Sequence, residues 1–115
     1  MSGAGAEAEA AAWLEARGLT VRERNWRCRF GELDLICEDG GTLVFVEVRA
    51  RARADFGGAA GSITAAKRAR LTAAARQYLA QLPRTPPCRF DCVLVSGADG
   101  QHTLEWLRNA FDAAS

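Results

Sequence analysis

The sequence FGELDLICEDGGTLVFVEVR, residues 30–49, contains two strand-like segments joined by a short turn. Residues 30–38 and 43–49 are rich in apolar and β-branched side chains, which is typical of strands. The Asp-Gly-Gly-Thr segment between them is typical of a turn that closes a β-hairpin. A symmetric turn pairs residues whose numbers add up to 81, so the sequence predicts both a hairpin and its register.

This register places two acids, Asp34 and Glu47, directly opposite each other, and it pairs Glu32 with Arg49. Directly opposed side chains have Cβ atoms about 4.5–5.5 Å apart, a distance at which two like charges destabilise a sheet. The opposed acids therefore predict a positive partner between them, most simply a divalent metal ion. Two solvated acids on the exposed face of a hairpin are the alternative interpretation.

Strand alternation extends this acidic pair into a patch on one face of the hairpin. The expected patch face comprises Glu32, Asp34, Ile36, Phe45, Glu47 and Arg49, and the apolar opposite face comprises Leu33, Leu35, Val44, Val46 and Val48. Mg²⁺ prefers carboxylate and phosphate oxygens as ligands. The patch therefore predicts a Mg²⁺ or Mn²⁺ site suited to the hydrolysis of phosphodiesters.

The length of 115 residues suits one domain with a single modest core. No apolar run approaches the roughly 20 residues of a membrane-spanning helix, and the N-terminal sequence lacks the pattern of a secretion signal. The four cysteines lack the spacing of a structural zinc site, and Cys37 and Cys92 alternate with apolar residues as core side chains do. We therefore expect a cytoplasmic protein with reduced thiols and no membrane partner.

The net charge is only +1, but the charges are unevenly distributed along the chain. Residues 49–76 contain seven cationic side chains and one acid, Asp55, so this segment carries +6 and the remainder −5. A cationic segment beside an acidic patch suits a polyanion held near metal ions, although a solvated helix face has a similar composition. The charge distribution thus favours a nucleic acid as the partner.

The remaining sequence predicts an α/β fold with a mixed sheet and flanking helices. The expected helices span residues 5–17 and 63–82, and the further strands include residues 19–21, 88–96 and 103–107. The second helix lies between two strands and suits a right-handed crossover. Such a crossover would make the strands on either side of it parallel.

Four segments of the chain resemble motifs of the small bacterial YraN family. They are RNWRCRFGELDLI (24–36), LVFVEVRAR (43–51), GSITAAKRARLTAAARQYL (61–79) and RFD (89–91), and the resemblance covers about residues 6–111. Members of this family are assigned to the restriction-endonuclease-like fold with a PD-(D/E)XK site, and they resemble archaeal Holliday-junction resolvases. The resemblance implies a Mg²⁺-dependent nuclease-like protein that acts on DNA phosphodiester bonds, with branched or damaged DNA as candidate substrates.

The resemblance also implies roles for individual residues. Asp34 takes the place of the motif aspartate and Glu47 that of the motif acid, both as metal ligands at a catalytic site. The helix glutamate of the family pattern falls on Glu7, with Glu9 as a nearby competitor. The motif lysine is replaced by Arg49, which stays charged and is a poor proton acceptor.

Lys67 is the single lysine among fifteen lysine and arginine residues. A chain that uses arginine almost everywhere would keep one lysine for a role that arginine fills badly, although one leftover lysine also needs no functional explanation. We predict that Lys67 reaches toward the acidic patch and partly substitutes for the missing motif lysine. It would then assist catalysis together with Arg49.

Phosphate contacts are predicted for the arginines near these motifs: Arg27, Arg51, Arg53, Arg68 and Arg70. Two alternatives to a nuclease stay open. The first is a non-catalytic nucleic-acid-binding module with a degenerate site, and the second is a protein-interaction domain whose acidic patch is incidental. A homodimer is also compatible with the resemblance, because cutting a four-way junction requires two symmetric cuts.

Overall fold

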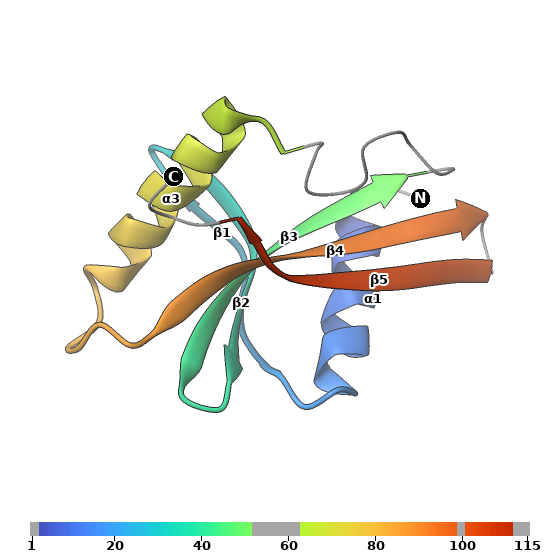
Figure 1. Cartoon of the computed structure of the whole chain (residues 1–115), viewed down its shortest axis with the longest axis horizontal. Coiled ribbons are helices and arrows are strands. Elements are labelled where there is room, and N and C mark those ends of the chain that lie inside the picture. Colours follow the sequence, from blue (N-terminus) through green and yellow to red (C-terminus); the bar gives the residue numbers. More distant parts are fainter. Residues whose placement is uncertain (1–2, 52–62, 99–100, 112–115) are drawn as a thin grey trace.

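The computed structural model of the chain describes residues 3–51, 63–98 and 101–111, which form two helices and a five-stranded sheet. The elements are α1 (Gly3–Glu15), β1 (Thr20–Cys28), β2 (Gly31–Asp39), β3 (Thr42–Arg51), α3 (Ala65–Leu79), β4 (Cys88–Ala98) and β5 (Gln101–Phe111). α1 packs on one face of the sheet and α3 on the other, so the sheet forms the middle of three layers (Figure 1).

The sheet is mixed, and its strand order follows the chain, β1-β2-β3-β4-β5. The β3–β4 pair is parallel, and the other three pairs are antiparallel. The parallel pair follows from the connection through α3, because a crossover helix returns the chain to the same end of the sheet. The predicted α/β fold with a mixed sheet is therefore confirmed, and it is compatible with the restriction-endonuclease-like fold.

The β2–β3 hairpin has the predicted register next to its turn. Leu35 pairs with Val46 and Asp39 pairs with Thr42, so the numbers of paired residues add up to 81. Gly40 has a φ of 63°, in the left-handed region that glycine adopts without a steric penalty, which allows a two-residue turn. The register of this part of the hairpin is thus specified by local sequence.

Two apolar layers fill the spaces between the sheet and the helices. The layer under α3 contains the buried rings of Phe45, Tyr78 and Phe90, and ring centroids within it lie 5.4–6.2 Å apart. The layer under α1 consists largely of alanine, leucine and valine side chains. Cys37 and Cys92 are buried in these layers, as predicted, and all four cysteines are free thiols.

The alternation of β2 is interrupted at Asp34, and the predicted face is wrong for Leu33. Leu33 packs in the layer under α3, whereas Leu35 packs in the layer under α1, so two residues expected on one face lie on opposite faces. The register of β1 with β2 skips Asp34 and the residue across from it, Asn25, which has a left-handed φ of 52°. Irregularities of this kind change the local twist and redirect side chains.

Several elements differ from their predicted bounds. β1 continues to Cys28, beyond its predicted end. It lacks apolar alternation because it is an edge strand whose side chains are mostly exposed. β5 spans Gln101–Phe111 rather than 103–107, since pairing with β4 extends it at both ends. α3 begins after Thr64, whose hydroxyl accepts a hydrogen bond from the Lys67 backbone N–H at 3.1 Å and caps the helix.

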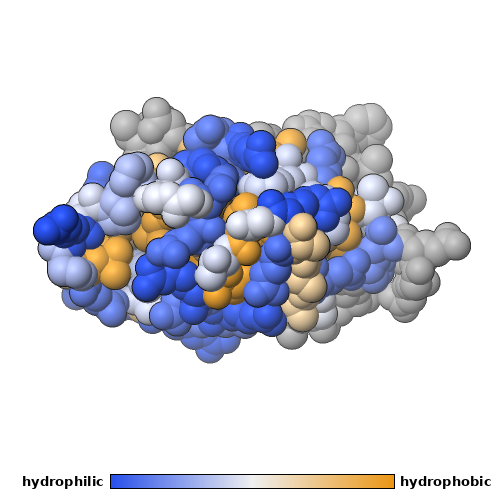
Figure 2. All heavy atoms as spheres, turned by 90° about the horizontal axis from the view of Figure 1, so that it is seen from below, coloured by the Kyte–Doolittle hydropathy of each residue, from blue (hydrophilic) through white to orange (hydrophobic). Residues whose placement is uncertain are grey.

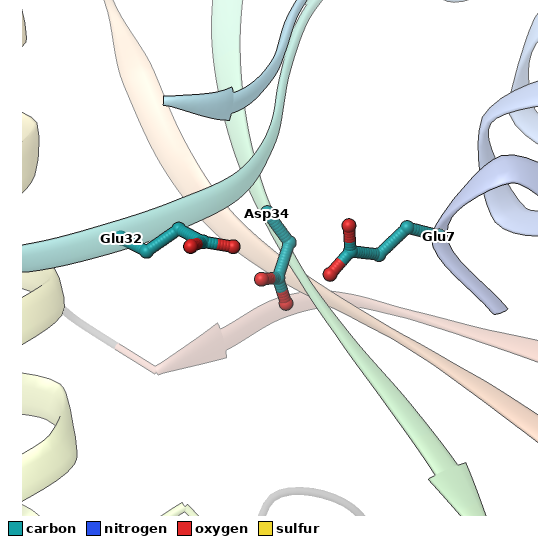
Figure 3. Close-up of side chains that lie close together, drawn as sticks. All are labelled: Glu7, Glu32 and Asp34. Carbon is teal, nitrogen blue, oxygen red and sulfur yellow. The ribbon is translucent and has the colours of Figure 1, made fainter. Parts of the chain in front are cut away.

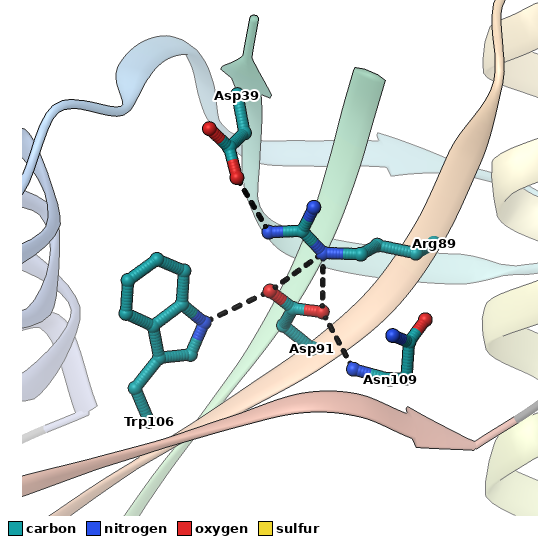
Figure 4. Close-up of polar contacts among 5 residues, drawn as sticks. All are labelled: Asp39, Arg89, Asp91, Trp106 and Asn109. Atoms are coloured by element: carbon teal, nitrogen blue, oxygen red, sulfur yellow. Dashed lines mark hydrogen bonds and ion pairs between the residues drawn. The ribbon is translucent and has the colours of Figure 1, made fainter.

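A fully buried aspartate, Asp91 on β4, is surrounded by hydrogen-bond donors (Figure 4). Arg89 Nε donates to both carboxylate oxygens at 3.0 and 3.2 Å, Trp106 Nε1 donates at 2.8 Å, and the backbone N–H of Asn109 donates at 3.0 Å. Arg89 Nη2 also lies 3.0 Å from Asp39 Oδ2 at the end of β2. This network ties β4 to β5 and to the β2–β3 turn.

Hydrophilic side chains cover much of the face seen in Figure 2, and apolar groups lie in separate areas between them. Isolated apolar groups of this kind are ordinary on protein surfaces. Among the residues that the structure describes, no helix is long and apolar enough to cross a membrane.

Candidate active site

Three carboxylates from two elements converge beside the irregular part of β2. Glu7 extends from α1, and Glu32 and Asp34 extend from β2, with Asp34 between the other two (Figure 3). One carboxylate oxygen of each residue lies within 4.8 Å of the others. A single cation with oxygen ligands could bridge groups at this spacing.

Asp34 and Glu47, the predicted opposing acids, lie close enough for their charges to interact. Burial, followed by the charge of Glu47, raises the pKa of Asp34 from its ordinary value of 3.8 to about 8. The Val48 backbone N–H, which donates to Asp34 Oδ2 at 2.9 Å, acts in the opposite direction and favours the ionised form. A positive group close to Asp34 would therefore favour its ionised form.

Glu47 is buried, with only 5% of its side chain exposed, and it is paired with cations of the same chain. Lys67 Nζ, from α3, lies 2.9 Å from Glu47 Oε2, and Arg49 Nη1 lies 3.8 Å from the same oxygen. The structure therefore brings Lys67 to the acidic patch. Lys67 also stands closer to Glu47 than the arginine at the motif position does.

The two glutamates that compete for the helix position have different partners. Glu7 lies in the carboxylate cluster, where burial and the charge of Glu32 raise its pKa. Glu9 points elsewhere, because its Oε1 lies 2.6 Å from Nδ1 of His102 on β5. The acid that α1 contributes to the cluster is therefore Glu7.

A pocket of about 200 Å³ opens beside these carboxylates, between β2 and α3. Its lining residues are Gly31, Glu32, Asp34, Lys67, Arg70 and Leu71. Acids on β2 thus face cations on α3 across one cavity. This arrangement can hold a cation on one side and an anionic group on the other.

The arginines predicted to contact phosphate have different surroundings. Arg70 lines the pocket, and Arg68 is half-buried on the same helix. Arg27 forms an ion pair with Glu32, with Nε 2.8 Å from Oε2, although 79% of the Arg27 side chain stays exposed. The Arg51 side chain and Arg53 lie outside the described residues.

The predicted pairing of Glu32 with Arg49 is wrong. The register of β2 with β3 ends at Leu35 and Val46, and Glu32 instead pairs with Arg27 on β1. Glu32 nevertheless joins the carboxylate cluster, although the sequence did not predict it as a metal ligand. Its expected place in the acidic patch was the signal that could have identified it.

The sequence matches a known family over most of its length. A family profile described as "Uncharacterised protein family UPF0102" matches residues 6–95. The chain belongs to the UPF0102 family. The predicted membership of the YraN family, which is the same family, is thereby confirmed.

Relatives in the UPF0102 family align with nearly the whole chain. A UPF0102 protein of Nitrosomonas eutropha is 54% identical over 110 residues, which cover 96% of this chain and 92% of the relative. A relative in Dechloromonas aromatica is 57% identical over 108 residues, or 94% of this chain and 86% of the relative. A third, in Nitrosococcus oceani, is 49% identical over 112 residues, or 96% and 90%. These relatives carry the family name alone.

Proposed function

We propose that this UPF0102 protein is a divalent-cation-dependent, nuclease-like enzyme that hydrolyses phosphodiester bonds in DNA, with branched or damaged DNA as its substrate. The observation that carries the proposal is the convergence of Glu7, Glu32 and Asp34 within 4.8 Å, next to the Glu47–Lys67 ion pair. The adjoining pocket also contains Arg70. Carboxylates for a cation and positive side chains for phosphate are the groups that metal-assisted phosphodiester hydrolysis needs.

The donor set fits a hard cation such as Mg²⁺ or Mn²⁺, which prefers carboxylate oxygens. Asp34, Glu47 and Glu7 are the proposed ligands, and Glu32 lies within 4.8 Å of two of them, Asp34 and Glu7. Burial, followed by the charge of Glu47, raises the pKa of Asp34 to about 8, and a cation among these groups would favour their ionised forms. Such an ion supplies a water of lowered pKa and neutralises charge on a phosphate.

Lys67 and Arg49 are the proposed electrostatic helpers. Lys67 presents a compact ammonium group at the edge of the carboxylate cluster, where it can hold a water or a phosphate oxygen. Arg49 is 35% exposed and can clamp a phosphate through its guanidinium fork. We expect Lys67→Arg to lower the cleavage rate at least about tenfold because arginine cannot supply a compact donor there. Unchanged cleavage and unchanged DNA affinity would contradict this role.

DNA binding is proposed to use Arg68 and Arg70 on α3, with Arg27, Arg51 and Arg53 as further phosphate contacts. Such contacts supply affinity without reading sequence. A homodimer is proposed for the cutting of branched DNA, since a four-way junction requires two symmetric cuts. A cytoplasmic location is proposed because the four free thiols suit a reducing compartment.

One observation favours a second candidate function, which is nucleic-acid binding without catalysis. Glu47 has two positive partners within the chain, Lys67 and Arg49, and these compete with any added cation for its carboxylate. The motif position also carries arginine, which accepts a proton poorly. In this alternative the pocket binds phosphate and no bond is cut.

Incubation with linear, flap and four-way-junction DNA in Mg²⁺ or Mn²⁺ distinguishes the two candidates. The wild type should cut at least one structured DNA, and Glu47→Gln should abolish the cutting. Glu105→Gln, which changes an exposed acid on β5, is the matched control and should cut normally. Salt-sensitive binding without cutting would support the second candidate, and the absence of salt-sensitive binding would contradict both.

A further inference from the structure

Asn25 on β1 combines two features that are unusual for an exposed residue in a strand. Its φ of 52° lies in the left-handed region, which residues other than glycine rarely adopt. Its side-chain amide also lies beside the carboxylate of Glu7 on α1, where it favours the ionised form of Glu7. An uncommon backbone conformation that aims a polar group at a candidate site is a reason to ask what the group does there.

The position of Asn25 in the sheet is directly across from Asp34. The flanking pairs are Arg24 with Leu35 and Trp26 with Leu33. The irregularity in β2 that redirects Asp34 is therefore matched by one in β1 that redirects Asn25. The two irregularities bring a carboxylate and an amide to the same place, where Glu7 also lies.

We infer that Asn25 is a positioning residue, which holds the Glu7 carboxylate beside Asp34 so that α1 can contribute a ligand to the proposed cation site. Glu7 is on a helix and the other clustered acids are on β2, so a polar side chain on β1 beside both elements can hold the acids at their observed distance. Asn25 is suited to this role because its side chain donates without adding charge. The inference rests on the proposed function of the site.

Three variants separate the side chain of Asn25 from its backbone conformation. Asn25→Gly removes the amide, and glycine accepts a φ of 52° without strain, so this variant should fold normally. Asn25→Ala removes the same amide and adds backbone strain. Asn109→Gly is the matched control, because Asn109 has the same φ of 52° but uses its backbone N–H to bind Asp91.

Mn²⁺ binding, followed by the electron paramagnetic resonance signal of free Mn²⁺, tests the inference without reference to activity. Asn25→Gly should weaken Mn²⁺ binding about 10-fold or more, the size of effect seen when a hydrogen-bond partner of a metal ligand is lost. Asn109→Gly should bind within about twofold of the wild type, a difference too small for a lost ligand partner. Equal Mn²⁺ affinities of Asn25→Gly and the wild type would overturn the inference alone. Absence of Mn²⁺ binding by the wild type would overturn the proposed function and the inference with it.

A second measurement tests the Asn25–Glu7 contact in the presence of a chelator. Urea unfolding of the wild type, Asn25→Gly, Glu7→Gln and the double variant gives the coupling between the two side chains. The effect of the double variant on the unfolding equilibrium constant should differ by about twofold or more from the product of the two single effects, as is usual for residues in contact. Additive effects would show that Asn25 does not hold Glu7 and would overturn the inference even if Mn²⁺ binds.

Discussion

Asp34 and Asp91 occupy similar positions in the sheet but have opposite surroundings. Asp91 lies at a shift in the register of β4 with β5, and Asp34 lies where the pairing of β1 with β2 skips one pair. Each faces an asparagine with a φ of 52°. For Asp34 that residue is Asn25, whose amide favours the ionised form of the neighbouring Glu7. For Asp91 it is Asn109, whose backbone N–H donates a hydrogen bond to Asp91 itself. The same arrangement, an aspartate opposite an asparagine with a left-handed backbone conformation, therefore occurs in two different surroundings.

The difference lies in the groups around each carboxylate. Donors surround Asp91 (Figure 4), whereas other acids surround Asp34 (Figure 3). A buried carboxylate whose oxygens all accept hydrogen bonds helps to specify the fold. A carboxylate crowded by like charges instead lowers the stability of the protein in the absence of a ligand. The comparison teaches that two aspartates in similar positions differ in their energetic role, because hydrogen-bond donors stabilise one and like charges crowd the other.

The largest effect on stability should come from removing the Asp91 carboxylate and the hydrogen bonds that it accepts. We expect Asp91→Ala to lower the free energy of unfolding by about 3–5 kcal/mol, because it leaves Arg89 and two further donors without their shared acceptor. Asp39 is the outer partner of Arg89, and 40% of the Asp39 side chain is exposed. Asp39→Ala should therefore lower the free energy of unfolding by about 1 kcal/mol or less. Urea denaturation measures both. Equal effects of the two substitutions would contradict the structural role of Asp91.

The next effect concerns ligand binding at the crowded site. Glu7→Gln should weaken Mn²⁺ binding about 10- to 100-fold, comparable with the loss of a group that supports a metal centre. Glu9→Gln changes an acid on the same helix that pairs with His102 instead, and its Mn²⁺ affinity should match that of the wild type. Isothermal titration calorimetry measures both affinities. A larger loss of Mn²⁺ affinity in Glu9→Gln than in Glu7→Gln would show that Glu9, and not Glu7, is the ligand on the helix.

A smaller effect is expected in the pH dependence of stability with a chelator present. The pKa of Asp34 is raised from 3.8 to about 8 in the folded protein, so the folded state holds this proton more tightly than the unfolded state does. The stability that this proton contributes is complete below about pH 4 and is lost as the pH rises through about 8. Relative to Asp34→Asn, the wild type should lose at least about 1.4 kcal/mol over this range, the equivalent of one pKa unit.

Thermal or urea unfolding at several pH values, with the wild type and Asp34→Asn compared at each, measures this difference. Subtraction removes the contribution of other titrating groups, which both proteins share. A difference that stays constant between pH 4 and 8 would show that burial and the charge of Glu47 do not raise the pKa of Asp34.

The smallest effect is expected for the cations that face the acids across the pocket. Arg70→Gln should weaken DNA binding a few-fold and reduce the slope of log affinity against log salt by about 1, as the loss of one phosphate contact does. Arg84→Gln, which changes an exposed arginine beyond α3, is the control and should leave the slope unchanged. Fluorescence anisotropy at several salt concentrations measures both. Equal slopes for Arg70→Gln and the wild type would show that the pocket is not part of the DNA-binding surface.

Local sequence determined the hairpin, its turn and the register next to the turn. The pairing of Leu35 with Val46 follows from the position of the two glycines and from the period of two that strands impose on apolar residues. The crossover that makes β3 and β4 parallel follows from the helix between them. The approach of Asp34 to Glu47 was predictable on the same basis, because both residues lie a few positions from that turn.

Only the tertiary structure decided which groups join these two acids. The choice of Glu7 over Glu9 depends on the rotation of α1 about its axis, which packing against the sheet sets. The contact of Lys67 with Glu47 depends on where α3 crosses the sheet. The wrong face predicted for Leu33 has the same origin, since alternation assumes a regular strand and the paired irregularity at Asn25 and Asp34 changes the face on which the side chains lie.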